Sequence, residues 1–175
     1  PAAPEYDEHI ADDILGTFET PHWMEPAKVG KDKDIDAWRF ARDESGAIKQ
    51  VGTRFSEVRV LIPWSALDGT PHGVLIHGHG QNGTHNQISG GFYKKLANTE
   101  DLLIVGVNML GMSSEDVPGI VGMLFELSDF HTMADRLHQG VLDHASVMRG
   151  FKNTFDGHAE IGKLGVKIDK DALYY

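Results

Sequence analysis

The chain has 175 residues, 41% hydrophobic and 24% charged, a composition typical of one globular domain and not of a disordered or membrane-spanning chain. A formal net charge of −10 opposes binding to a phosphate backbone, so we expect no nucleic-acid partner. The absence of cysteine excludes disulfides, thiolate metal sites and a cysteine nucleophile. The compartment is left open, with a secreted or cell-envelope location possible, because the chain starts at Pro1 without signal-peptide features.

Residues 1–34 are rich in Pro, Asp, Glu and Lys and predict an extended N-terminal arm, with a short extended segment at 17–20. Residues 35–175 form the predicted domain. Its first strand-like segments, at 37–40 and 48–55, flank a polar turn that ends in Gly46, a pattern that predicts a hairpin.

Two apolar segments predict strands at 58–63 and 73–77, and the second should be interior because it is apolar throughout. A helix is expected over 86–98, followed by a strand at 102–107; the apolar positions of the helix are Ile88, Phe92 and Leu96. A helical crossover between two strands favours parallel pairing. The fold class is therefore α/β, with a mixed sheet that begins antiparallel and continues parallel.

Residues 113–116 predict the N-terminus of a helix, with Ser114 as its cap and the apolar positions Ile120, Leu124 and Leu127 after it. A long helix is expected over 128–152, and its apolar side chains recur every three or four residues: Met133, Leu137, Val141, Ala145 and Met148. Residues 155–165 are expected to form a loop, and residues 172–175 begin another strand.

A glycine-rich loop lies between the strand at 73–77 and the following helix, where α/β proteins place binding and catalytic backbone. Gly78, Gly80 and Gly83 match the G-x-G-x-x-G spacing of dinucleotide-binding proteins, so a nucleotide-binding oxidoreductase is one alternative. The acidic residue that should end the next strand is missing, because that strand ends at Asn108.

The same loop contains two histidines, His77 and His79, whose alternation on a strand would place both rings on one face. A metallo-hydrolase motif of the H-x-H-x-D-H type would require Asp and His at the positions of Gln81 and Asn82. The motif is therefore incomplete, and we expect neither a metal nor a cofactor.

A third interpretation is an oxyanion hole, in which small residues let a backbone N–H approach a substrate carbonyl. The donor would be the N–H of Gln81, which follows His79 and Gly80. From spacing alone, a glycine-rich turn without a ligand remains an equal alternative.

The run from Val74 to Gly83 resembles the strand and G-H-G loop of bacterial α/β-hydrolases related to extracellular and lipoprotein lipases. Three further stretches are similar in the same order: Arg42-Asp43 with Gly46, then residues 111–116, then residues 134–140. The resemblance covers about residues 15–175. It implies an incomplete α/β-hydrolase sheet, a serine carboxylester hydrolase working through an acyl-enzyme, and a small-molecule or lipid ester as substrate.

In that family the strand that would begin at Ala172 leads into a G-x-S-x-G nucleophile motif, and the acid and histidine follow it. This sequence contains no G-x-S-x-G and ends at Tyr175. The resemblance therefore implies an N-terminal part that supplies the oxyanion loop, needs the remaining half of the domain and is inactive alone. Met109 and Met112 would line the substrate or pack in the core. The non-catalytic alternative is a fragment that associates through an unfinished sheet edge.

Overall fold

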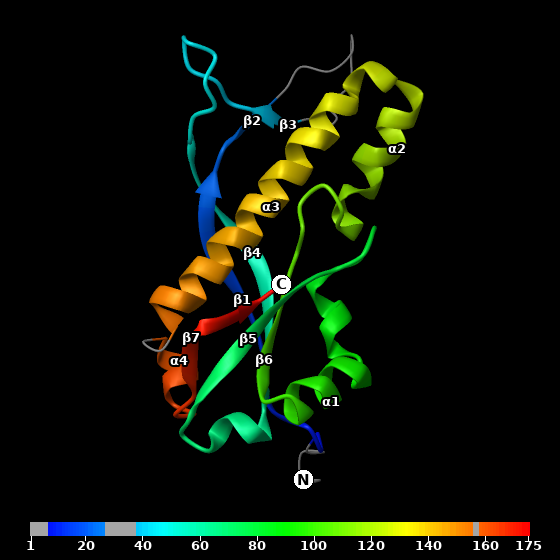
Figure 1. The fold of residues 1–175 in the computed structure, drawn as a ribbon. Helices are drawn as coiled ribbons and strands as arrows, with labels where there is room; N and C mark the ends of the chain where they lie inside the picture. Colours follow the sequence, from blue (N-terminus) through cyan, green and yellow to red (C-terminus); the bar gives the residue numbers. More distant parts are fainter. Residues whose placement is uncertain (1–6, 27–37, 156–157) are drawn as a thin grey trace.

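The computed structural model describes residues 7–26, 38–155 and 158–175. A five-stranded sheet forms its centre (Figure 1), and the strands are β1 (Ile10–His22), β4 (Gly52–Pro63), β5 (Pro71–Gly78), β6 (Leu102–Val107) and β7 (Lys167–Tyr174). The strands lie in the order β1, β4, β6, β5, β7. β4 pairs antiparallel with β1 and β6, whereas β5 pairs parallel with β6 and β7. The expected mixed α/β sheet, with an interior strand at 73–77, is confirmed.

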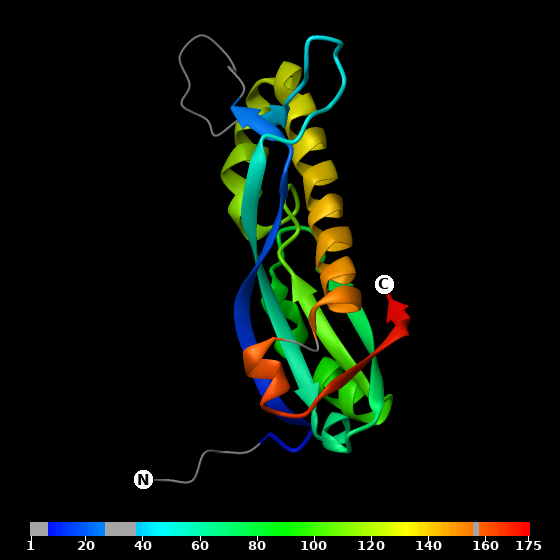
Figure 2. The same cartoon turned by 90° about the vertical axis from the view of Figure 1, so that its left-hand side faces the viewer.

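Strand β1 differs from the expected arm. It pairs with β4 from Ile10, opposite Pro63, to His22, opposite Gly52, and the two strands run side by side along the molecule (Figure 2). Sequence alternation did not reveal it, because the strand lies at the edge of the sheet and has acidic residues between its apolar ones. Residues 1–6 and 27–34 of the expected arm lie outside the described residues.

The expected hairpin is reduced to one bridge, between Arg42 and Ile48. The Asp43 carboxylate accepts the N–H groups of Ser45 and Ala47 and thereby closes the turn. The segment before it, β3 (Trp38–Phe40), pairs instead with β2 (Met24–Pro26) in a second, two-stranded sheet. The segments expected at 48–55 and 58–63 are largely one strand, β4, and residue 37 lies outside the described residues.

The two shorter helices differ from their predictions. The helix expected at 86–98 is divided into a 3-10 turn, η2 (His85–Ser89), and α1 (Gly91–Thr99), because Gly90 is extended. Phe92 was placed on the buried face, but it is 71% exposed. The next helix, α2 (Val117–Phe125), likewise leaves Leu124 exposed.

Helix α3 (Phe130–Asn153) confirms the long helix, and the short helix α4 (Ala159–Gly162) lies in the expected loop. The apolar series predicted for this helix does not form its buried face, because Val141, in the middle of that series, is 54% exposed. The middle of that face is polar instead, with Gln139, Asp143 and His144 buried. No helix among the described residues is long and apolar enough to cross a membrane.

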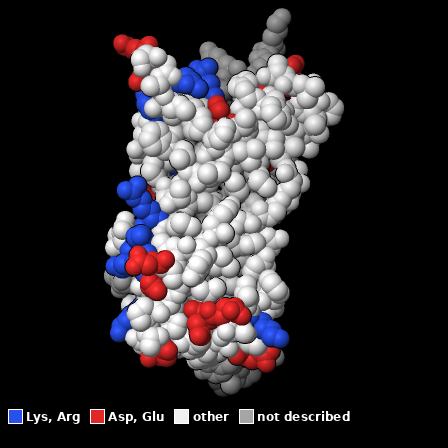
Figure 3. Space-filling view, viewed as in Figure 1, with Lys and Arg blue, Asp and Glu red and all other residues white. Residues whose placement is uncertain are grey.

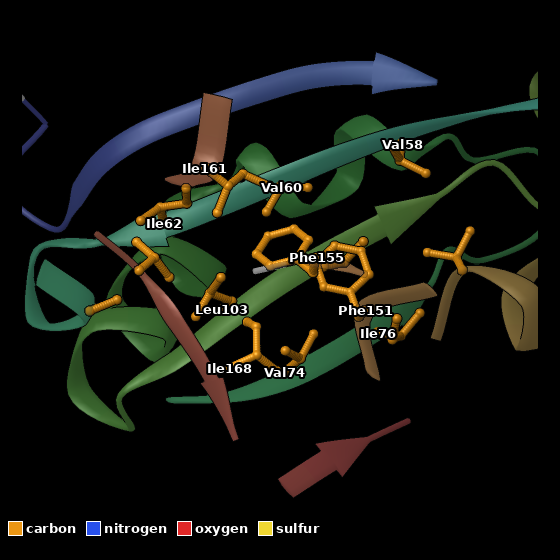
Figure 4. Packing of buried hydrophobic residues seen from close by; sticks show 14 of the residues in the cluster. Val58, Val60, Ile62, Val74, Ile76, Leu103, Phe151, Phe155, Ile161 and Ile168 are labelled. Atoms are coloured by element: carbon orange, nitrogen blue, oxygen red, sulfur yellow. The ribbon is translucent and has the colours of Figure 1, made fainter. Parts of the chain in front are cut away.

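Alternate residues of β4 point to opposite faces of the sheet. Helix α3 covers one face and helix α1 covers the other. Ile62 belongs to the larger cluster, which also contains Phe151 of α3 (Figure 4). Leu61 points the other way and packs with Ala97 of α1.

Candidate functional site

Two loops meet at the carboxyl ends of the parallel strands β5 and β6. The N–H of Asn82 in the first loop donates to Met112 O in the second at 2.7 Å. The N–H of Met109 in the second loop donates to His79 Nε2 in the first at 2.9 Å. The structure thus brings together all the residues that the sequence predicted for the site: His79, Gly80, Gln81, Met109 and Met112.

Among the described residues, the N–H of Gln81 differs from those of its neighbours in the loop because it has no acceptor. Gly80 N–H donates to Gln87 Oε1 at 3.3 Å, Asn82 N–H to Met112 O, and Gly83 N–H to Gly80 O at 2.9 Å. Within the part of the chain that the structure describes, no hydrogen bond uses the N–H of Gln81, and the residue is exposed. A Cβ on Gly80 would meet nothing within 4 Å, so space remains open beside this donor.

His79 is almost fully buried, with 3% of its surface exposed. Its Nδ1 lies 2.8 Å from Gly80 O and its Nε2 accepts the Met109 N–H, so both ring nitrogens are engaged within the protein. The imidazole is therefore not open to a ligand, whereas the backbone at Gln81 is exposed. The catalytic role of the loop itself stays a prediction.

Close backbone contacts hold the two loops against the rest of the fold. A Cβ on Gly106 of β6 would lie 2.5 Å from His85 O, and one on Gly140 of α3 would lie 2.5 Å from Leu110 O. Gly111 has a φ of 85°, a conformation that favours glycine. The sequence analysis assigned no packing role to these glycines, because the backbone atoms that would meet a Cβ belong to segments distant in sequence.

The second loop continues into a capped turn. Asp116 Oδ2 accepts both the N–H and the hydroxyl of Ser113, and Asp116 Oδ1 accepts from Arg136 Nε of α3 at 2.8 Å. The sequence had predicted Ser114 as the cap of this turn, but the structure shows that the cap is Ser113. The Ser113 hydroxyl is buried and already donates to a carboxylate, so it is not placed as a nucleophile.

The histidines do not converge on a metal. His77 Nε2 lies 3.0 Å from Gln87 Oε1, and its ring packs on Tyr93 of α1, whereas His79 turns toward Met109. The two rings therefore do not share one face as expected. In residues 7–26, 38–155 and 158–175, no group of three or more His, Cys, Asp or Glu side chains could hold a metal ion.

The glycine spacing also lacks the helix that a dinucleotide site uses. In such sites the helix N-terminus begins at the glycines and faces the pyrophosphate. Here the 3-10 turn η2 follows Gly83, and α1 begins only at Gly91. Comparisons of this chain with family models, with curated proteins and with solved structures found no match, so its function is inferred from this geometry and from its motifs.

Proposed function

We propose that this chain is the oxyanion-loop part of a serine carboxylester hydrolase with the α/β-hydrolase fold, acting on small-molecule or lipid esters. The observation that carries the proposal is the N–H of Gln81, which is exposed and makes no hydrogen bond within the described residues. It lies beside a residue without a side chain, Gly80, so a carbonyl oxygen has room to approach it. A fixed backbone donor of this kind stabilises the negative charge of acyl transfer.

In the proposed reaction a serine Oγ attacks the ester carbonyl carbon and passes its proton to a general base. The carbonyl oxygen becomes an oxyanion that accepts the N–H of Gln81. Collapse of the tetrahedral intermediate releases the alcohol, and water then hydrolyses the acyl-enzyme. Met109 and Met112 are proposed to line the acyl group, and the proposed reaction uses no metal or cofactor.

The nucleophile, base and acid are proposed to lie outside residues 1–175. The sequence has no G-x-S-x-G motif, and the Ser113 hydroxyl is bonded to Asp116. The chain alone is therefore proposed to be inactive.

The remaining half of the domain is proposed to pack over α3 and the end of β7. Support comes from apolar side chains exposed there: Val141, Leu142, Tyr174 and Tyr175. Figure 3 shows that charged side chains gather along one side and at the ends of this face, leaving its centre uncharged. Covering such a surface removes apolar area from water.

Association through the edge of β7 is the non-catalytic alternative. The strand carries charges at Lys167, Asp169 and Asp171, and its register with β5 shifts between Ile168 and Leu173. Both features hinder pairing of a sheet edge with another chain. Size-exclusion chromatography of residues 1–175 separates the two ideas, because stable dimers through β7 would favour the non-catalytic alternative.

The experiment is ester hydrolysis by two proteins, residues 1–175 and the protein extended past Tyr175 through a nucleophile motif. We expect no turnover of short or long acyl esters by residues 1–175 and clear turnover by the extended protein. Turnover by residues 1–175 would contradict the site assignment. An inactive but folded extended protein would contradict the proposed function.

The nucleotide-binding alternative is tested by titrating residues 1–175 with a nicotinamide dinucleotide. We expect no binding, since Gly83 is not followed directly by an α-helix. Saturable binding that Gly80→Ala abolishes would favour the oxidoreductase instead.

A further inference from the structure

The peptide unit that joins Gly80 to Gln81 is held by its carbonyl oxygen. Gly80 O accepts the N–H of Gly83 at 2.9 Å, and His79 Nδ1 lies 2.8 Å from the same oxygen. A carbonyl oxygen has two lone pairs and accepts both donors. The inner side of this peptide is thus fully occupied.

The other nitrogen of His79 determines where the ring carries its proton. The N–H of Met109 can only donate, and it meets His79 Nε2 at 2.9 Å, so Nε2 must present its lone pair. In a neutral imidazole the proton is then on Nδ1, which donates to Gly80 O. The opposite tautomer would place two donors together at Met109 and two lone pairs together at Gly80 O.

The geometry of a trans peptide links this hydrogen bond to the proposed donor. The described chain contains no cis peptide bond, and in a trans unit the C=O and the N–H point in opposite directions. Holding Gly80 O inward therefore turns the N–H of Gln81 outward. The same ring also ties this loop to the loop after β6, through Met109.

We infer that His79, as its neutral Nδ1–H tautomer, is a positioning residue that orients the N–H of Gln81 and fixes the two loops relative to each other. The inference rests on the proposed function of that N–H. It assigns the imidazole no contact with substrate and no transfer of a proton in the reaction.

The experiment is NMR spectroscopy of residues 1–175, in which long-range ¹H–¹⁵N correlations identify the protonated nitrogen of His79. We expect the proton on Nδ1 and a protected amide at Met109. His79→Gln keeps an acceptor near the position of Nε2, whereas His79→Asn keeps a donor near the position of Nδ1. Amide exchange at Met109 should therefore stay slow in the Gln variant and become about tenfold faster in the Asn variant, the effect of losing one hydrogen bond.

A proton on Nε2 of the wild-type ring would overturn the inference, and so would unchanged Met109 exchange in a folded His79→Asn variant. If that variant fails to fold, the wild-type tautomer decides alone. Neither measurement uses an ester. The inference can thus fail while the extended protein still hydrolyses esters, and it can hold while the proposed hydrolysis fails.

Discussion

Asp143 of α3 and Arg54 of β4 form an ion pair in which the carboxylate side chain is fully buried. The same carboxylate accepts the hydroxyl of Thr20 of β1 at 2.8 Å and the side-chain amide of Gln139 at 2.9 Å. One acidic group therefore joins the long helix to two strands of the sheet.

Asp143→Ala should strongly destabilise the fold. It leaves the Arg54 guanidinium, which is 25% exposed, without its partner, and we expect a loss of about 3–5 kcal/mol. Urea unfolding measures the change. The control is Glu25→Ala, which removes an exposed ion pair with Arg39 and should cost less than about 1 kcal/mol. Equal effects of the two substitutions would show that the buried pair does not hold the helix.

Two helical glycines should respond oppositely to alanine. Helix propensity favours Ala over Gly by about 1 kcal/mol, and Gly119 of α2 has open space around it, so Gly119→Ala should stabilise. In Gly140→Ala the new Cβ would meet Leu110 O at 2.5 Å, and we expect a net loss of about 1–3 kcal/mol. Thermal unfolding of both variants tests the close contact of α3 with the loop after β6. A stabilising Gly140→Ala would contradict it.

Two glycines of the loop after β5, Gly83 and Gly80, separate the effect of close packing from the effect of access to the proposed donor. Gly83→Ala places a Cβ 2.9 Å from Gly80 O and 3.1 Å from His79 Cβ, and it should destabilise residues 1–175 by about 1–3 kcal/mol. Gly80→Ala meets nothing and should change stability by less than about 0.5 kcal/mol. In the extended protein, however, Gly80→Ala should lower kcat/KM by partly covering the N–H of Gln81. Full activity of that variant would argue against this approach to the donor.

The stability of the chain should fall in mild acid because of His144. Burial lowers the pKa of His144, and this effect outweighs its hydrogen bond to Gly140 O and the nearby Asp143, both of which raise it. The unfolded ring titrates at about pH 6.5, so as the pH falls below that value the unfolded state binds a proton before the folded state does. The stabilisation is thus present above about pH 6.5 and is lost as the pH falls toward the lower folded pKa.

Unfolding free energies at about pH 7.5 and about pH 5.5 measure this loss. His144→Phe should reduce the difference between the two values, while the pH dependence that arises from the half-buried ring of His22, whose pKa burial also lowers, remains. An unchanged difference in His144→Phe would assign the acid sensitivity to other groups.

The sequence predicted the elements whose signal is local. Continuous apolar runs indicated the strands at 58–63, 73–77 and 102–107, and the structure confirms them as parts of β4, β5 and β6. Strand β1 is at the edge and carries acidic residues between its apolar ones, so no local pattern marked its full length. The buried face of α3 was predicted wrongly because it contains a charged residue, Asp143. Its ion-pair partner, Arg54, is distant in sequence, so no local pattern indicated that the carboxylate could be buried.

The residues of the candidate site were predictable because the carboxyl ends of adjacent parallel strands meet at one edge of a sheet. The contacts that fix them were not. The hydrogen bond from Met109 to His79 and the close approach of Gly140 to Leu110 join segments whose separation in sequence gives no signal.

The proposed oxyanion donor is tested most directly by the structure of the extended protein after reaction with an ester-like phosphonate, whose phosphoryl oxygen takes the place of the oxyanion. The measurement is the distance from that oxygen to Gln81 N. We predict about 2.7–3.1 Å, with Gly80 O still accepting from Gly83. A phosphoryl oxygen bound by other donors and more than about 3.5 Å from Gln81 N would contradict the account.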